Sequence, residues 1–500
     1  MEISFLNKSI DAYREISCQT KRIQESVESV VPDTDEDIGQ IAAVQSSVLL
    51  KSKDITSRGV LVSGEARASL LYITESRDSV SFVRLSKSFS IEYDVSDITP
   101  DALAQISLSV VSAEGRIINP RKVSVSFDIA GEMSCYIREA VNIEASLPGD
   151  ECPGLHVKYD SAELGTVNAV SEKTFSVNEQ FSFPGGKPVP SRFVSGKAEF
   201  NAADCQLIGS KVIVKGSADI SVCYLSDEVN YPVKTEFSTP FSQIVDIGEE
   251  NMDLCSAKIE LSGAYYDIID SINGDKALNA ELHAVLQMIS TSRKKVVYAS
   301  DAYSNLMPAE CLRQNCRFNV LSDMQRIKLT ADERISVSDD CADVLSAFVS
   351  PARIAQEQTK IRANVNLDIV YRTTSGQISA AGRSVALEGE GASPDIRIIG
   401  SRLSDVYLRP DGQYVDGHFA LELTCRGCSS VEFERIVSVE LDEEEPFDYD
   451  QYPTVTLVRT DGESLWELAK RYHSSVERIA ALNDVDGDFT GKMLLIPKTV

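Results

Sequence analysis

The sequence of 500 residues is poor in the side chains on which many catalytic and metal sites depend. It contains four histidines, His156, His283, His418 and His473, which are far apart in the chain. None of them stands in an H-E-x-x-H pattern or beside a nucleophile motif, so the sequence predicts no histidine-based catalytic or zinc site. We therefore expect a protein that is not an enzyme and that has no catalytic residues, bound metal or cofactor.

Long apolar stretches are also missing. No run approaches the roughly 20 apolar residues that a membrane helix needs. The first residues, MEISFLNK, lack the basic region and apolar core of a signal peptide. The eleven cysteines are scattered along the chain, which is typical of reduced, mostly buried thiols in a cytosol. These absences predict a cytoplasmic protein without membrane insertion.

Two short motifs have the composition of functional sites but lack their full pattern. Cys425-Arg-Gly-Cys428 has the spacing of a zinc or redox pair, yet no second pair accompanies it. We interpret it as a turn with two incidental thiols. Pro184-Gly-Gly-Lys-Pro188 lacks the glycine spacing and the hydroxyl residue of a phosphate-binding loop, so it is predicted to be a turn. Carboxylates are abundant, and nothing selects a glycosidase-like pair among them.

Positive charge is scarce. The chain has 49 lysines and arginines against 76 aspartates and glutamates, which gives a net charge of −27. A surface of this sign repels nucleic acid and anionic membranes, so neither is an expected partner. Residues 453–500 carry six basic and seven acidic residues, so nearly all of the excess lies in the first 452 residues. The simplest interpretation is solubility, and the alternative is attraction to a basic protein.

The first 440 residues contain a repeated strand motif. It occurs at Val60–Tyr72, Val212–Tyr224 and Thr359–Tyr371, and the three tyrosines are 152 and 147 residues apart. In each copy the tyrosine follows a glycine, or an alanine in the third copy, by eight residues. Apolar residues alternate with mainly polar ones, as in antiparallel sheets with one face in water.

Shorter features recur with this motif. An aromatic pair follows the first two copies and an aliphatic pair follows the third: Phe82 and Phe89, Phe237 and Phe241, and Ile378 and Val385. We predict a mainly β chain of three tandem antiparallel β-sandwich-like domains, the third divergent, followed by a small βααβ module. The expected boundaries are 1–155, 156–308 and 309–440 for the repeats, 441–452 for an acidic linker that frees the last module, and 453–500 for that module.

The last 48 residues show the signals of a compact module. Thr454–Val458 and Met493–Ile496 have the composition of short strands. Two capping-box patterns and one helix stop lie between them: Ser464 with Glu467, Ser474 with Glu477, and Asn483. The expected core consists of Leu465, Trp466, Leu468, Ile479, Leu482 and Ile496.

Trp466 is the only tryptophan in the chain. It has two interpretations, an aromatic platform for a sugar or a partner, and a core residue that packs the first helix on the small sheet. We favour the core, because little else could fill so small a module. The neighbouring Lys470 and Arg471 are predicted to form a solvated helix face.

The segments Gly462-Glu-Ser-Leu-Trp466 and Gly491-Lys-Met-Leu-Leu-Ile-Pro497 resemble the LysM family. The resemblance implies a βααβ fold that grips N-acetylglucosamine polymers in a groove between the loop before the first helix and the loop after the second. The implied groove residues are Asp461, Gly462, Glu463, Ser464, Leu465, Asp484, Val485, Asp486 and Gly487. The second loop contains three acidic residues, Asp484, Asp486 and Asp488, which suits a basic protein partner at least as well as a glycan.

The tyrosine-containing repeats, the acidic segment Val31–Ile38 and the terminal LysM module together resemble a clostridial family of sporulation proteins with SPOCS (spore-coat-associated) domains. That resemblance implies a protein of the mother-cell cytosol that settles at the forespore surface in the spore coat. Its LysM module would dock a coat morphogenetic ATPase of the SpoIVA type, with other coat proteins as further candidate partners. The alternative is a cell-wall or cortex protein whose LysM module binds the N-acetylglucosamine chains of peptidoglycan.

Overall fold

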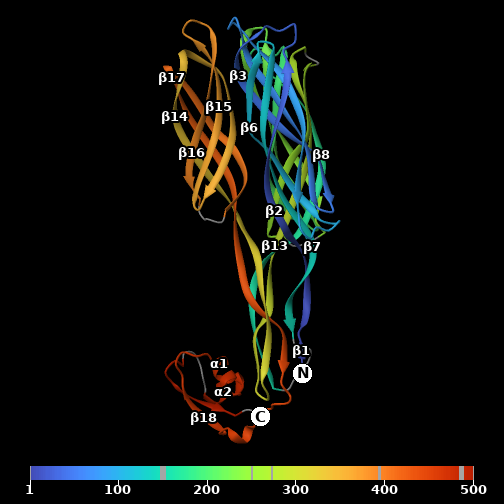
Figure 1. Ribbon diagram of the computed structural model, residues 1–500, viewed down its shortest axis with the longest axis vertical. Coiled ribbons are helices and arrows are strands. Elements are labelled where there is room, and N and C mark those ends of the chain that lie inside the picture. The colour runs from blue at the N-terminus through green and yellow to red at the C-terminus, as the bar shows by residue number, and fades with distance from the viewer. Residues whose placement is uncertain are drawn as a thin grey trace.

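The molecule is elongated and built mainly from long antiparallel strands, as predicted. Two β lobes at one end continue into a narrow stem, and a small module with two helices lies at the far end of that stem (Figure 1). The computed structural model describes residues 2–146, 154–248, 252–271, 274–391, 396–483 and 489–498. Within these residues, no helix is long and apolar enough to cross a membrane.

The first repeat is a sandwich of two antiparallel sheets. One sheet contains β3 (Ile38–Thr56), β4 (Gly59–Thr74) and β5 (Val80–Asp94). The facing strands are β2 (Leu6–Val30), β7 (Lys122–Ser146) and β6 (Leu103–Asn119), which form half of a six-stranded sheet. Their inward side chains, such as Leu70, Ile106 and Phe127, form one buried core.

The second repeat has the same arrangement. Its three-stranded sheet contains β9 (Arg192–Ile208), β10 (Lys211–Ser226) and β11 (Val229–Asp246). The facing strands are β8 (Leu155–Ser182), β13 (Lys276–Ser304) and β12 (Leu254–Asp270), which form the other half of the six-stranded sheet. The two halves meet where Tyr13 of β2 pairs with Val167 of β8, so the first two repeats share one sheet.

A five-stranded sheet contains the remaining strands outside the last module. Its strands are β14 (Ala309–Glu357), β15 (Lys360–Thr373), β16 (Ile378–Glu390), β17 (Ile396–Leu441) and β1 (Glu2–Ser4). The position of β1 differs from expectation, because Glu2–Ser4 pairs with the end of β17 and not with the first repeat. Cys425 and Cys428 lie within β17, where Cys425 pairs with Gln325. The predicted turn at these cysteines is therefore wrong, since the backbone there belongs to the ladder between β17 and β14, with a register shift between Arg426 and Cys428.

The three predicted motif strands coincide with most of β4, β10 and β15, and each of these lies at the centre of three hydrogen-bonded strands. Their tyrosines are fully buried. Each phenol oxygen hydrogen-bonds to a segment more than 30 residues upstream: Tyr72 to the Glu36 carbonyl at 3.2 Å, Tyr224 to the Pro188 carbonyl at 3.0 Å, and Tyr371 to the Ser338 hydroxyl at 3.2 Å. A buried phenol needs such a partner, which accounts for the fixed place of tyrosine in the motif.

The glycine of the motif leaves room for an aromatic ring at Gly64, and at Gly216 for the Asn201 carbonyl as well as a ring. Gly64 pairs with Phe89, and Gly216 pairs with Phe241. A Cβ atom at Gly64 would lie only 2.3 Å from Cζ of Phe89, so the ring occupies the space of a side chain. In β15 the pair is Ala363 with Leu387. The counterpart of the second phenylalanine is thus Leu387, and not Val385 as the sequence suggested.

The stem consists of the ends of strands that continue from the lobes. The last residues of β13 pair with the start of β8, and the start of β14 pairs with the last residues of β17. Ile3 and Phe5 near the amino terminus pack among Ala299, Ile436 and Val439 in a small buried core. Both chain ends therefore lie toward the same end of the molecule (Figure 1).

Candidate functional site

The last module has the predicted strand–helix–helix–strand order. Its elements are β18 (Val455–Arg459), α1 (Leu465–Arg471), α2 (Val476–Asn483) and β19 (Met493–Pro497), and the two strands pair antiparallel. A 3-10 turn, η1 (Tyr449–Gln451), precedes them. The loop that opens the site leads from β18 to α1.

The start of α1 has the predicted capping box. The Glu467 amide donates to the Ser464 hydroxyl at 3.2 Å, and the Ser464 amide donates to a Glu467 carboxylate oxygen at 2.7 Å. These bonds satisfy amide groups that the first turn leaves free. They also draw the Glu467 pKa below its ordinary value, because the Ser464 backbone and side chain both donate to the carboxylate.

The second predicted capping box is wrong by one residue. Ser475, not Ser474, accepts the Arg478 amide at 3.3 Å at the start of α2. Ser474 is fully buried, and its hydroxyl donates to the Pro497 carbonyl at 2.5 Å. The helix ends at Asn483 as predicted. The Asn483 side chain also pairs with both backbone groups of Leu495, at 2.6 and 2.7 Å, which ties α2 to β19.

The core of the module includes a residue from outside it. Leu468, Ile479 and Ile496 are buried, and Leu465 and Trp466 pack against them partly buried. Leu482 is 46% exposed, so its assignment to the core is wrong. The helix directs Ile479 inward and leaves Leu482 on its outer surface. The buried cluster is completed by Tyr303, near the end of β13 in the stem.

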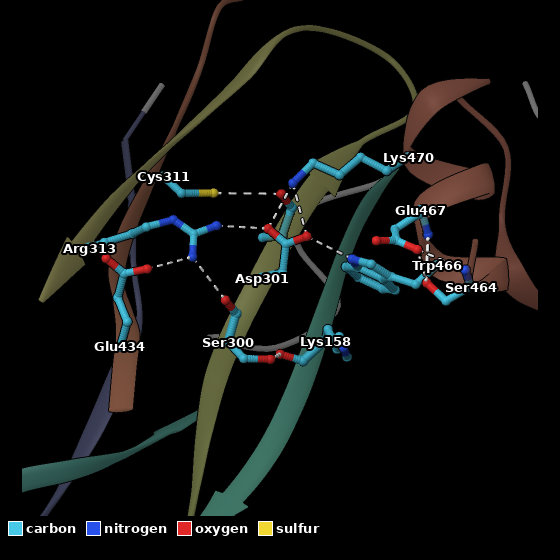
Figure 2. Close-up of polar contacts among 11 residues, drawn as sticks. Lys158, Ser300, Asp301, Cys311, Arg313, Glu434, Ser464, Trp466, Glu467 and Lys470 are labelled. Atoms are coloured by element: carbon cyan, nitrogen blue, oxygen red, sulfur yellow. Dashed lines mark hydrogen bonds and ion pairs between the residues drawn. The ribbon is translucent and has the colours of Figure 1, made fainter. Parts of the chain in front are cut away.

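Asp301, also near the end of β13, forms the polar part of the same contact (Figure 2). The indole N–H of Trp466 donates to its Oδ2 at 2.7 Å, and the Lys470 ammonium contacts both carboxylate oxygens at 2.7 and 2.9 Å. On the stem side, Arg313 of β14 donates to Oδ1 at 2.9 Å. Lys470 thus pairs with the stem although it is exposed, and Trp466 makes a docking contact that neither interpretation of the sequence anticipated.

The electrostatics of Asp301 follow from these donors. Burial acts to raise its pKa, but the hydrogen bonds from Lys470 and Trp466 outweigh burial and hold the pKa below its ordinary value. The carboxylate is therefore charged at neutral pH and pairs with the cations of the module and the stem. Asp301 and Tyr303 together, which we call the stem seat, hold α1 against the stem.

Aromatic contacts extend the stem seat. The Tyr303 hydroxyl donates to the Ser474 carbonyl at 2.9 Å. Its ring packs edge-on against Trp466 and stacks on His156 of β8, with both ring centroids 4.9 Å away. Burial lowers the pKa of His156, so its imidazole is neutral at pH 7. The module thus contacts the stem through aromatic rings at Tyr303 and through charged groups at Asp301.

The segment 441–452 does not free the module from the third repeat. The Asp442 amide donates to the Pro308 carbonyl at 3.0 Å, and the Phe447 amide donates to the Leu306 carbonyl at 2.9 Å. The Phe447 ring lies 3.9 Å from the His473 ring in the module. The segment is thus a strap across the turn between β13 and β14, and the expectation of an unattached linker is wrong.

Only one side of the predicted groove lies within the described residues. Asp461, Gly462 and Ser464 are exposed, whereas Glu463 and Leu465 are half-buried. Glu463 pairs with Arg471, whose Nη1 lies 3.1 Å from its Oε2. Asp484, Val485, Asp486 and Gly487 lie outside the described residues. The Thr460 amide donates to the Lys492 carbonyl at 3.0 Å, and the Thr460 hydroxyl donates to the Phe489 carbonyl. The start of the first predicted loop therefore lies beside the end of the second.

Comparisons with known families agree with this architecture. A family model described as SipL, SPOCS domain, matches residues 37–118 and 191–269, and the LysM domain model matches residues 460–497. The chain therefore contains SPOCS and LysM domains. No curated protein and no solved structure matches it. SPOCS and LysM domains are non-catalytic binding modules, and their combination links the chain to sporulation.

The two SPOCS matches cover equivalent parts of the first two repeats. One extends over β3, β4 and β5 and nearly all of β6, and the other extends over their counterparts β9 to β12. The assignment of 309–440 as a third SPOCS repeat stays a prediction, supported by the buried tyrosine of β15. The stem seat was missed because Asp301 and Tyr303 belong to no local motif. Only their contact with the LysM domain, more than 160 residues away in the chain, shows that these two residues have a role.

Proposed function

We propose that this chain is a non-enzymatic assembly protein of the spore envelope, whose LysM domain docks a SpoIVA-like coat morphogenetic ATPase at the forespore surface. The proposal follows from the pairing of SPOCS domains with a LysM domain. It is supported by one feature of the fold, the fixed place of the LysM domain at the end of the stem, far from the SPOCS lobes (Figure 1). The protein would thus hold two partners apart, one at each end.

The expected place of action is the mother-cell side of the forespore. The mainly acidic SPOCS lobes would face other coat proteins, and the groove of the LysM domain would face the ATPase. We propose Asp461 and Glu463 on the described side of the groove, and Asp486 on the other side, as residues that contact the partner. A basic patch on the partner would complement these carboxylates.

A second candidate function is binding of peptidoglycan, because LysM domains bind N-acetylglucosamine polymers and the family match is to such a domain. In that case the same groove would hold the glycan, and the envelope partner would be the cortex or the cell wall. The exposed polar side chains of the loop, Asp461 and Ser464, offer hydrogen bonds to sugar hydroxyls.

The experiment compares the two partners with the full chain, since Tyr303 contributes to the LysM core and residues 453–500 alone would lack it. Purified SpoIVA-type ATPase and insoluble peptidoglycan are offered separately. We expect saturable binding to the ATPase, weakened at least tenfold by Asp461→Arg, with Asp411→Arg on the third repeat as the matched control. Saturable pelleting with peptidoglycan, competed by N-acetylglucosamine oligomers and without ATPase binding, would contradict the proposal in favour of the second function.

A further inference from the structure

The two-stranded sheet of the LysM domain has apolar side chains on both of its faces. Leu494 and Ile496 of β19 point toward the helices and are buried in the core. Alternate residues of a strand point to opposite faces, so the residues between them point away from the helices. These residues form three cross-strand pairs, which we call the outer face: Val455 with Pro497, Leu457 with Leu495, and Arg459 with Met493.

The outer face is apolar and open to solvent. Five of its six residues are apolar, and its valine, methionine and two leucines are between 40% and 58% exposed. An antiparallel sheet with one face on a core normally has polar side chains on its other face. The stem seat and the strap contact α1 and His473, and they leave the outer face uncovered. Exposed apolar side chains that gather in this way mark a surface that binds another protein.

The layout of the outer face fits a second copy of itself. The Leu457–Leu495 pair lies at the centre, with one further pair on each side of it along the strands. A two-fold axis between two outer faces, perpendicular to the strands, would place this central pair against its own copy. The Val455–Pro497 pair would then lie against the Arg459–Met493 pair of the second copy. Such a contact covers the apolar residues of both faces.

The charge of Arg459 selects this orientation. If the strands of both copies ran in the same direction, the two guanidinium groups would lie at the same end of the interface and repel each other. With the strands reversed, each Arg459 meets the Val455 end of the second copy. The acidic segment 441–452 leads into that end, where Asp448 and Asp450 are exposed. Lys498 at that end continues the strand alternation onto the helix side, since its amide still donates to the Thr454 carbonyl at 2.9 Å.

We propose that the outer face is a homodimer interface, through which two copies of this chain join LysM domain to LysM domain with two-fold symmetry. The face is small compared with the roughly 20–30 residues that each partner contributes to a standard interface, so the dimer should be weak and reversible. Asp461 and Glu463 of the predicted groove are not part of the outer face. A dimer would therefore present two grooves together, which strengthens binding to a partner with repeated sites.

The test measures the mass of the full-length chain by sedimentation velocity across the micromolar range of concentration. We expect the average mass to rise from that of one chain toward that of two. Leu457→Asp places like charges at the centre of the interface and should weaken dimerisation by at least about tenfold. Leu457 is exposed, so this change leaves the core intact, and unchanged Trp466 emission checks the fold. Ile244→Asp is the matched control, because Ile244 is a similarly exposed apolar strand residue of the second repeat.

A charge reversal tests the orientation of the two copies. Arg459→Glu should weaken the dimer, and the added change Asp450→Arg should restore part of the loss. An unchanged dimer in Arg459→Glu would overturn the reversed orientation. The proposal as a whole is overturned if the wild-type chain stays monomeric at every concentration, or if Leu457→Asp dimerises as well as Ile244→Asp.

The result can be separated from the function of the groove. Binding of the SpoIVA-type ATPase is measured at a concentration where the wild-type chain is monomeric, and Leu457→Asp should then bind as well as the wild type. A Leu457→Asp chain that loses ATPase binding, in a protein whose wild type never dimerises, would assign the outer face to the ATPase instead of to a second copy. A dimer that forms without any ATPase binding would support the present inference and contradict only the proposed function.

Discussion

Replacement of Asp301 by alanine should release the LysM domain from the stem. The change removes the acceptor for the Trp466 indole N–H and for the Lys470 ammonium, and it leaves Arg313 with Glu434 as its remaining carboxylate partner. Tyr303 and the backbone contacts of the stem seat would be untouched. The substitution therefore tests whether charge pairing, rather than ring packing alone, holds the domain in place.

The size of the effect can be worked out from the contacts. Hydrogen bonds to charged groups contribute about 1.5–3 kcal/mol each when they are sheltered. The Lys470 side chain is 43% exposed and that of Asp301 is 21% exposed, so screening by solvent reduces the contribution of this pair. We expect a total loss of about 2–3 kcal/mol in docking free energy, which corresponds to a roughly 30- to 150-fold shift toward the undocked form.

The assay uses the single tryptophan of the chain. Trp466 is part-buried against Tyr303 in the docked form. Its emission should shift to longer wavelength, and its quenching by acrylamide should increase, in Asp301→Ala. Asp301→Asn still accepts the indole N–H but has no charge, so its emission wavelength and acrylamide quenching should lie between those of Asp301→Ala and the wild type. Asp411→Ala is a control, because Asp411 is half-exposed and pairs with Arg334 on the third repeat.

The reasoning would be refuted if emission and quenching in Asp301→Ala equalled those of the wild type and of Asp411→Ala. It would also be refuted if the variant lost β structure as a whole, since the contact lies at the end of the stem. Small-angle scattering offers an independent check. A released domain should enlarge the maximum dimension of the particle or broaden its distribution of distances.

Three further predictions concern the cores. Gly64→Ala should destabilise the first repeat by about 1–3 kcal/mol in urea unfolding, because the new Cβ would lie 2.3 Å from Phe89. The added change Phe89→Leu should restore part of this loss, because it reproduces the Ala363–Leu387 pair of β15. Burial, helped by the charge of Glu132, raises the pKa of Glu260 from an ordinary 4.5 to about 7, against the donors Ser107 and Leu108 and the charge of Lys258. A raised folded-state pKa means that its contribution to stability is fully present below pH 4.5 and is lost as the pH rises through 7, so Glu260→Gln should flatten the urea midpoint between pH 5.5 and 8. Ile479→Ala should cost the LysM domain about 2–4 kcal/mol and Leu482→Ala less than 1, measured by thermal melts followed at Trp466.

Local patterns in the sequence were sufficient to predict the three motif strands and the LysM elements. The alternation around Tyr72, Tyr224 and Tyr371 reports which side chains are buried, and the Ser464–Glu467 pair reports a helix start, because both depend on neighbours within a few residues. The errors at Ser474 and Leu482 came from the same limit. A capping pattern shifted by one residue, or an apolar residue on an outer helix face, differs from the correct assignment only in three dimensions.

The stem seat was beyond such reasoning for a different physical reason. Asp301 and Tyr303 read in sequence as ordinary strand residues, and their role arises only when β13 and α1 meet across more than 160 residues of chain. The pairing of Glu2–Ser4 with β17 is of the same kind. Docking of this type depends on the shape and charge of two assembled surfaces, for which no periodicity exists in one dimension.

The direction of the stem strands has a mechanical consequence. The paired ends of β8 with β13 and of β14 with β17 run along the long axis between the β lobes and the LysM domain. A tension applied between those two ends would act parallel to the strands and perpendicular to their hydrogen bonds. The ladder would then be loaded in shear, so that many bonds resist together instead of opening one after another. A tether built in this way is stiff when it is pulled from end to end.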